Sequence, residues 1–131
     1  MLMDPISDML SIIKNGYQVG KKTVQMPFSN QKEAIIKILV QEGYLKDYQV
    51  KGQKPAEKKL FLRLKYQAKQ PVLRQAIRVS KPSRRFYVKA SSVPVVLSGF
   101  GLAILSTSQG LMTGEQAKNK HVGGELICKI S

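Results

Sequence analysis

The spacing of apolar residues changes near the middle of the chain, and this change constrains the fold more than any other feature of the sequence. Between Ile6 and Ile13 the apolar side chains recur at the i, i+3, i+4, i+7 spacing of one helix face. Beyond residue 71 this helical spacing gives way to short apolar segments separated by polar ones, which are typical of strands. The sequence therefore predicts an α+β fold, with an N-terminal α/β unit followed by a mostly β C-terminal domain that carries short helices.

The N-terminal domain, 1–66, is expected to have the order helix, strand, helix, strand, strand. Asp4 is suited to cap the first helix, and Gly16 is a reasonable stop for it. Either Ser29 or Asn30 caps the second helix, which Gly43 closes. The three strands are expected at 24–28, 44–50 and 60–66.

The C-terminal domain, 72–131, follows a short polar segment, 67–71, that has the composition of a linker. Its short helices are expected around 92–97 and 113–120, and Thr113 and Gln116 have the spacing of a capping box for the second. Its strands are expected at 72–79, 85–89, 101–106 and 125–130.

The chain carries a large excess of positive charge. Its 131 residues include 22 Lys and Arg against 8 Asp and Glu, which gives a formal net charge of +14 at pH 7. Charges of one sign repel one another, and a polyanion relieves that repulsion. Nucleic acid is therefore the first candidate partner and an anionic membrane surface the second. We disfavour the membrane because the basic residues do not gather on an amphipathic helix.

The cysteine and histidine content argues against catalysis and against secretion. Cys128 is the one cysteine, so no internal disulfide can form, and it lies in an apolar run typical of a buried structural thiol. His121 is the one histidine, and the carboxylates are scattered singly, without the spacing of a metal-binding loop. The first residues lack the basic start of a signal peptide, and we expect a cytoplasmic protein with no catalytic residue, metal or cofactor.

Cations and aromatic residues concentrate in the segment 81–87. Lys81, Arg84 and Arg85 can engage phosphates, and Tyr87 can stack on an unpaired base. The alternative interpretation is a solvated turn in which Phe86 packs inward. Strand alternation predicts that only one of the two aromatic side chains is available to RNA.

A polar segment, 106–110, directly follows an apolar strand. Hydroxyl groups donate and accept hydrogen bonds, so Ser106, Thr107 and Ser108 suit the recognition of base edges and 2′-hydroxyls. Clusters of Ser, Thr and Gly also form ordinary turns. Composition alone leaves both interpretations open.

Four separated motifs resemble the bacterial small-subunit ribosomal protein eight family. They are 4–10 with 13–15, 79–85, 101–110 and 122–128, and the resemblance extends along the whole chain. It implies a structural constituent of the 30S subunit, a primary rRNA-binding protein that binds the central domain of 16S rRNA and helps assemble the platform. It also implies two domains, and small-subunit proteins five and twelve as neighbours. Repression of its own operon through a messenger RNA copy of the rRNA site is a compatible second role.

The resemblance also assigns roles to individual residues. Hydroxyls of the 106–108 loop are expected to contact bases and sugar, Tyr87 to pack against RNA, and the cations to meet phosphates. Gly123 and Gly124 would permit close backbone approach, while Glu125 would accept from a base or order the loop. The complete expected RNA-binding set is Asp4, Lys14, Asn15, Lys54, Lys81, Arg84, Arg85, Tyr87, Ser106, Thr107, Ser108, Gln109, Gly123, Gly124 and Glu125.

Three positions depart from the pattern of that family. Gln109 stands where lysine is usual, so a phosphate contact there becomes a hydrogen bond. Ser83 replaces a glycine, which implies a turn without a positive φ or one that tolerates the strain. Ile12 replaces a common arginine, so the first helix is expected to contribute less to RNA binding.

Overall fold

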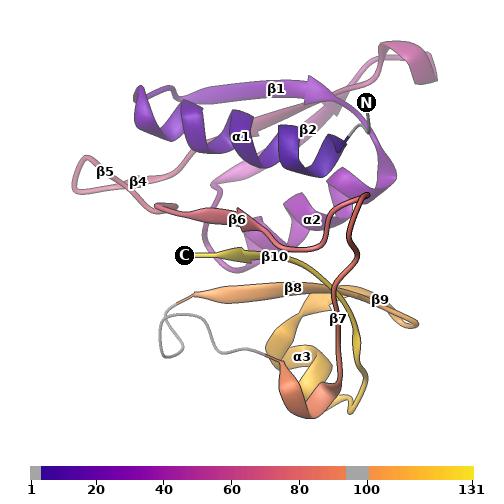
Figure 1. Cartoon of the computed structure of the whole chain (residues 1–131). Coiled ribbons are helices and arrows are strands. Elements are labelled where there is room, and N and C mark those ends of the chain that lie inside the picture. Colours follow the sequence, from indigo (N-terminus) through magenta and orange to yellow (C-terminus); the bar gives the residue numbers. More distant parts are fainter. Residues whose placement is uncertain (1–3, 94–100) are drawn as a thin grey trace. The chain divides into compact units, whose positions relative to one another are not determined.

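A computed structural model describes residues 4–93 and 101–131. Figure 1 shows the chain as two compact units. One is Asp8–Arg74, and the other joins Gln75–Ser131 to the described residues before Asp8. The predicted domains, 1–66 and 72–131, remain a prediction as independently folding pieces.

The first helix, α1 (Pro5–Gln18), begins where the sequence predicts and ends later. The Oδ1 of Asp4 accepts a hydrogen bond from the Ser7 N–H at 3.2 Å, as an N-cap does. Gly16 lies inside the helix, where a Cβ would come within 2.6 Å of the Val24 side chain. The stop is Gly20, at φ +75°, followed by a hydrogen bond from the Lys21 N–H to the Gly16 carbonyl. The expected end at Gly16 was therefore wrong, because that glycine provides close packing.

The second helix, α2 (Asn30–Gln41), is capped by Ser29, whose hydroxyl accepts from the Lys32 N–H. It follows strand β1 (Thr23–Pro27), and it precedes strands β2 (Asp47–Lys51) and β3 (Lys59–Arg63). A short 3-10 helix, η1 (Pro55–Glu57), connects β2 to β3. The two later strands are shorter than predicted, and the order of elements is as predicted.

The three strands form an antiparallel sheet in the order β1-β3-β2. Val24 pairs with Leu62 and Met26 with Leu60, and all four side chains are buried. Figure 1 shows α1 and α2 on the same side of this sheet. The residues that alternate with these four along β1 and β3 lie on the other face of the sheet.

The segment expected to be a linker is a β-hairpin. Strands β4 (Tyr66–Gln67) and β5 (Gln70–Pro71) pair through a two-residue turn, Ala68 and Lys69, both at positive φ. Two positive φ values define a type I′ turn, which favours Asn-Gly. Ala-Lys carries no such signal, so the composition indicated a linker instead.

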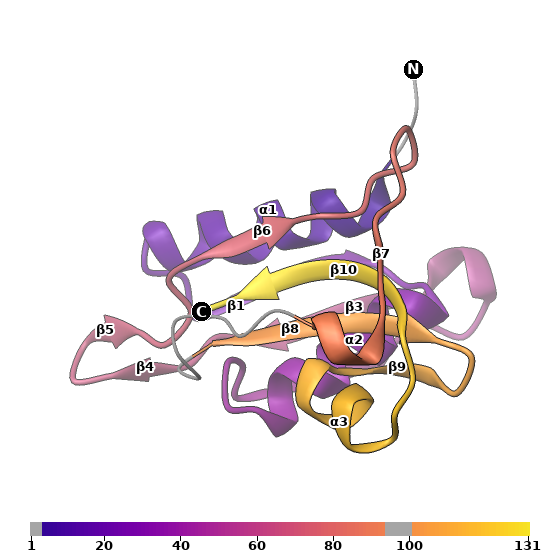
Figure 2. The ribbon, with the colours of Figure 1, turned by 60° about the horizontal axis from the view of Figure 1, so that its bottom comes forward.

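The C-terminal unit is built around β10 (Gly124–Ile130). Strands β6 (Ala76–Arg78) and β7 (Tyr87–Val88) pair with successive parts of one edge of β10, and β8 (Leu102–Thr107) pairs with the other edge. Figure 2 shows β10 running between β6 and β8. The expected strands 72–79 and 85–89 are thus reduced to short pieces at one edge of the sheet.

The structure contains a second hairpin that the sequence did not predict. Strand β9 (Gly110–Thr113) pairs with β8, so the polar segment 106–110 spans the end of one strand and the start of the next. Helix α3 (Gly114–Asn119) follows with the predicted capping box between Thr113 and Gln116. Of the helix expected at 92–97, the described residues show a 3-10 helix, η2 (Ala90–Ser92), and positions 94–97 lie outside them.

The core of the C-terminal unit joins α3, η2 and the inner face of the sheet. Buried side chains in one of its clusters are Val93, Ala103, Leu105, Met112, Ala117 and Leu126. Helices and antiparallel sheets in this order confirm the predicted α+β class.

Candidate nucleic-acid interface

Three of the expected RNA-binding residues form one row across the sheet where β10 begins. Glu125 of β10 is the register partner of Tyr87 in β7 on one side and of Ser106 in β8 on the other. Direct partners in antiparallel strands project from the same face. The row therefore places an aromatic ring, a carboxylate and a hydroxyl side by side. Tyr87 is 70% exposed, while Ser106 and Glu125 are half-buried.

The carboxylate of Glu125 holds the neighbouring segment in place. Its Oε2 accepts from the Ser80 hydroxyl and, at 2.9 Å, from Nη1 of Arg85. Ser80 is fully buried, and its hydroxyl also accepts from the Phe86 N–H at 3.1 Å. Of the two roles expected for Glu125, ordering the loop is the one that these contacts provide.

The same contacts keep Glu125 ionised. Burial raises the pKa of this carboxyl, but the hydrogen bonds from Ser80 and Arg85 and the charge of Arg78 outweigh burial, so its pKa lies below the ordinary value. Arg85 is half-exposed and retains guanidinium donors that can reach a phosphate.

Lys81 and Arg84 flank a tight turn beside this row. Each backbone N–H of the pair donates to the carbonyl of the other at 3.0 Å, and both side chains are exposed. Ser83, at the tip, is not among the residues with positive φ. A turn that does not need glycine explains the serine at this position.

Both aromatic residues of the segment are exposed, which corrects the prediction that one of them packs inward. Phe86 is 49% exposed, beside Tyr87 at 70%. Strand β7 begins only at Tyr87 and lies at an edge, so Phe86 has no strand to direct it into the core. Two aromatic rings are thus exposed in this segment. Together with Val79 and Lys129 they help to line a shallow depression.

The hydroxyl segment is a two-residue hairpin turn rather than a loop. Thr107 pairs with Gly110, which leaves Ser108 and Gln109 exposed at the tip. The Thr107 hydroxyl donates to the Gly110 carbonyl at 2.9 Å and accepts from the Gln109 N–H at 3.1 Å. Thr107 therefore shapes the turn, and Ser108 and Gln109 present their side chains to solvent.

Gly123 and Gly124 are required by the packing of the chain itself. A Cβ at Gly124 would overlap the carbonyl oxygen of Ser106, and a Cβ at Gly123 would lie 2.5 Å from that of Val88. Because both neighbours are backbone atoms, neither can move aside cheaply. The two glycines allow β8 and β7 to approach β10 where the row forms.

Asp4 is engaged inside the C-terminal unit. Its Oδ2 lies 3.1 Å from Nε of Arg78, whose Nη1 donates to the Ile127 carbonyl at 2.8 Å. The side chains of Asp4 and Arg78 are 18% and 7% exposed. The carboxylate thus joins the start of α1 to β6, a structural role that the sequence did not indicate.

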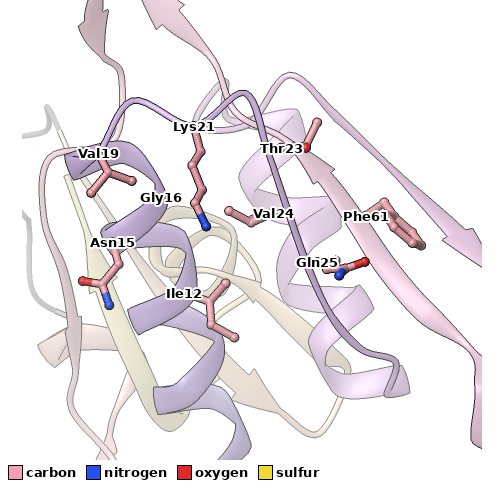
Figure 3. A pocket seen from close by; sticks show the side chains of 9 residues that line it. All are labelled: Ile12, Asn15, Gly16, Val19, Lys21, Thr23, Val24, Gln25 and Phe61. Carbon is pink, nitrogen blue, oxygen red and sulfur yellow. The ribbon is translucent and has the colours of Figure 1, made fainter.

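The remaining expected contacts belong to the N-terminal unit. Lys14 and Asn15 lie on α1, and Lys54 is exposed just before η1. Asn15 lines a groove between α1 and β1, into which the side chain of Lys21 extends (Figure 3). These three residues are therefore on a different unit from the Tyr87 row.

Sequence reasoning missed Ser80 and Arg78. Both are polar residues with little exposure, and each bonds to a residue more than forty positions away in the chain. Such contacts have no local signal, because a buried serine and a loop serine look alike in sequence. The only available signal was the position of Ser80 beside the basic segment.

The described residues include no reactive thiol and no cluster of metal-binding side chains. Cys128 is buried, and burial raises the pKa of its thiol to about 12, which makes it unreactive. Within residues 4–93 and 101–131, no group of three His, Cys, Asp or Glu side chains is placed to hold a metal ion. No helix in that same part of the chain is long and apolar enough to cross a membrane.

Exposed aromatic rings, hydroxyls and cations at one end of a sheet are typical of proteins that bind nucleic acid. A comparison with protein families shows which family of nucleic-acid-binding proteins the chain matches. Residues 4–131 match the ribosomal protein S8 family, and the chain belongs to that family. This confirms the resemblance noted in the sequence and makes the chain a ribosomal protein rather than an enzyme.

Similar proteins match over nearly their full length. The chain is 50% identical to the small ribosomal subunit protein uS8 of Mycoplasmopsis synoviae over 129 residues, 98% of each chain. It is 50% identical to that of Dictyoglomus turgidum over 127 residues, 97% of this chain and 96% of the relative. With that of Dichelobacter nodosus it shares 44% over 131 residues, all of both chains. These names agree with the expected place in the small ribosomal subunit.

Proposed function

We propose that this protein is a primary rRNA-binding protein that binds the central domain of 16S rRNA and helps assemble the platform of the small subunit. The observation that carries the proposal is the row of Tyr87, Glu125 and Ser106, together with the exposed turn at Ser108 and Gln109. Sequence-specific RNA recognition uses unpaired bases, which stack on aromatic rings and bond to polar side chains. The row offers both kinds of contact on one face.

The residues around the row would make different kinds of contact with RNA. Tyr87 is the stacking surface, and the exposed Lys81 and Arg84 meet phosphates on either side of their turn. Ser108 and Gln109 donate to and accept from base edges and 2′-hydroxyls. Glu125 accepts hydrogen bonds from Ser80 and Arg85, which lie on either side of the 81–84 turn, and it thereby holds this turn and β7 against β10.

The expected partners follow from the same proposal. Small-subunit proteins five and twelve would be its protein neighbours, as family membership implies. We expect the rRNA site to be an internal loop, whose unstacked bases can reach the row. A messenger RNA that copies this internal loop would occupy the same row, because the chemistry of the bases is the same. Repression of its own operon, a second role compatible with rRNA binding, would then need no second surface.

A filter-binding titration over a range of salt concentrations tests the electrostatic part of the proposal. Arg84→Ala should weaken binding to a 16S central-domain fragment and reduce the slope of log K against log salt by about one. The matched control is Lys37→Ala, which removes an exposed cation from α2 and should leave the slope unchanged. If the two variants behave alike, the surface at Arg84 does not bind the RNA backbone.

A vesicle experiment separates RNA from the other polyanion considered. In pull-downs at equal salt, the purified protein should be retained on the immobilised RNA fragment and not on vesicles containing anionic phosphatidylserine. Stronger retention on the vesicles than on the fragment would contradict the proposal.

A further inference from the structure

The sheet of the N-terminal unit exposes a face that the proposed function does not use. Phe61 of β3 pairs with Gln25 of β1 on one side and with Gln49 of β2 on the other, so the three side chains form a row on one face. The two glutamines are exposed and Phe61 is half-buried. Figure 3 shows Val24 directed toward α1 and Phe61 directed away from it. The row therefore lies on the face of the sheet opposite the helices.

Cations stand on both sides of this aromatic ring. Lys59 and Arg63 precede and follow Phe61 by two positions on β3, so they share its face, and Lys51 pairs with Lys59. Successive same-face positions on a strand are about 7 Å apart. Asp47 is the one acidic side chain on this face among the residues of the three strands, and Arg63 already binds it. The face is thus an aromatic centre with amides beside it, the positive charge of Lys51 and Lys59 at one end, and the Arg63–Asp47 ion pair at the other.

The ring of Phe61 already accepts a positively charged group over its face. The Nζ of Lys51 lies 4.8 Å from the ring centroid. Lys51 is an exposed side chain, which can move away at little cost. The group over this face of the ring is therefore an exposed, movable side chain.

We propose that this face, formed by Gln25, Gln49, Lys51, Lys59, Phe61 and Arg63, binds a single-stranded RNA segment. One base stacks on Phe61, and the glutamine amides bond to the edges of that base or of its neighbours. Each stacked nucleoside has a phosphate on its 5′ and its 3′ side, and one of the two would meet Lys51 and Lys59. Only an unpaired base can lie on a ring in a sheet, so the ligand is a single strand and not a duplex. This inference does not rest on the proposed function of the C-terminal unit.

The experiment measures the binding of a fluorescently labelled, mixed-sequence RNA octamer to the full-length protein by anisotropy. Phe61→Leu, which keeps an apolar side chain, should weaken octamer binding at least fivefold. Phe61→Tyr should stay within twofold of wild type, because it keeps the ring. Lys59→Gln should weaken binding more than Lys37→Gln, which removes a cation from α2. Tyr87→Leu, which removes the exposed ring of the C-terminal unit, should weaken octamer binding less than Phe61→Leu does.

The controls distinguish this inference from the proposed function. Phe61→Leu should bind the 16S central-domain fragment like wild type, whatever the fate of octamer binding. The inference is overturned if Phe61→Leu and Lys59→Gln bind the octamer like wild type. It is overturned equally if Tyr87→Leu weakens octamer binding more than Phe61→Leu does, which would place the single strand on the C-terminal unit. Lys59→Gln changes an exposed side chain, so it decides the matter even if a Phe61 variant fails to fold.

Discussion

Thr107 and Ser108 are adjacent hydroxyl residues, yet their removal should have different consequences. The Thr107 hydroxyl makes two hydrogen bonds that close the turn, whereas Ser108 is exposed at its tip. A net hydrogen bond contributes about 0.5–1.5 kcal/mol, and exposed bonds fall toward the lower end of that range. Thr107→Val keeps the branched shape and removes only the hydroxyl. It should lower the free energy of unfolding by about 1 kcal/mol, from two bonds at about 0.5 kcal/mol each, and Ser108→Ala by less than about 0.5 kcal/mol.

Urea unfolding followed by circular dichroism measures the difference in stability, and equal m-values check that the folded and unfolded states are unchanged. Filter binding to the 16S fragment measures the difference in RNA affinity. Ser108→Ala should bind about tenfold more weakly at unchanged stability, because an unmet polar partner costs about 1–3 kcal/mol. Gln109→Lys should instead raise affinity and steepen the salt dependence. Equal stability of Thr107→Val and Ser108→Ala would refute the structural role given to Thr107.

Four further changes test other parts of the structure by thermal or urea unfolding. Gly124→Ala should destabilise the protein by about 3 kcal/mol, because its Cβ meets backbone, whereas Gly20→Ala faces open space and should cost about 1–2 kcal/mol through its positive φ alone. Replacing Ala68 and Lys69 by Asn-Gly should stabilise by about 1–2 kcal/mol, and no gain would contradict the type I′ turn. Burial opposes ionisation of Glu125, but its hydrogen bonds still lower the pKa, so this carboxylate stabilises the fold above its unfolded pKa of about 4.3 and loses that effect as pH falls through the folded value. Glu125→Gln should therefore flatten the acid limb of stability, and an unchanged limb would count against the network.

The sequence predicted the parts of the fold that depend on local chemistry. Apolar spacing located α1 and α2, and cap residues such as Thr113 located the start of α3. Positions that depend on packing were mistaken. Gly16 resembles a helix stop, although it is buried against Val24, and the turn at Ala68 lacks the residues that its geometry favours.

The candidate site was predictable in its residue types and not in its arrangement. The cations, Tyr87 and the hydroxyl segment were all visible in the sequence. Their meeting at the start of β10 depends on strand register, which no local pattern specifies. The anchoring role of Ser80 and the exposure of Phe86 were missed for the same reason.

A double-mutant cycle between protein and RNA tests the central claim most directly. The affinities of wild type and Tyr87→Leu are measured for the 16S central-domain fragment and for a fragment whose internal loop is replaced by paired bases. Wild type should prefer the intact fragment by at least about tenfold, since stacking contributes about 1–3 kcal/mol per base. Tyr87→Leu should lose most of that preference while binding the paired fragment like wild type. If Tyr87→Leu weakens binding to both fragments equally, or to neither, the row on β7, β10 and β8 does not read the internal loop.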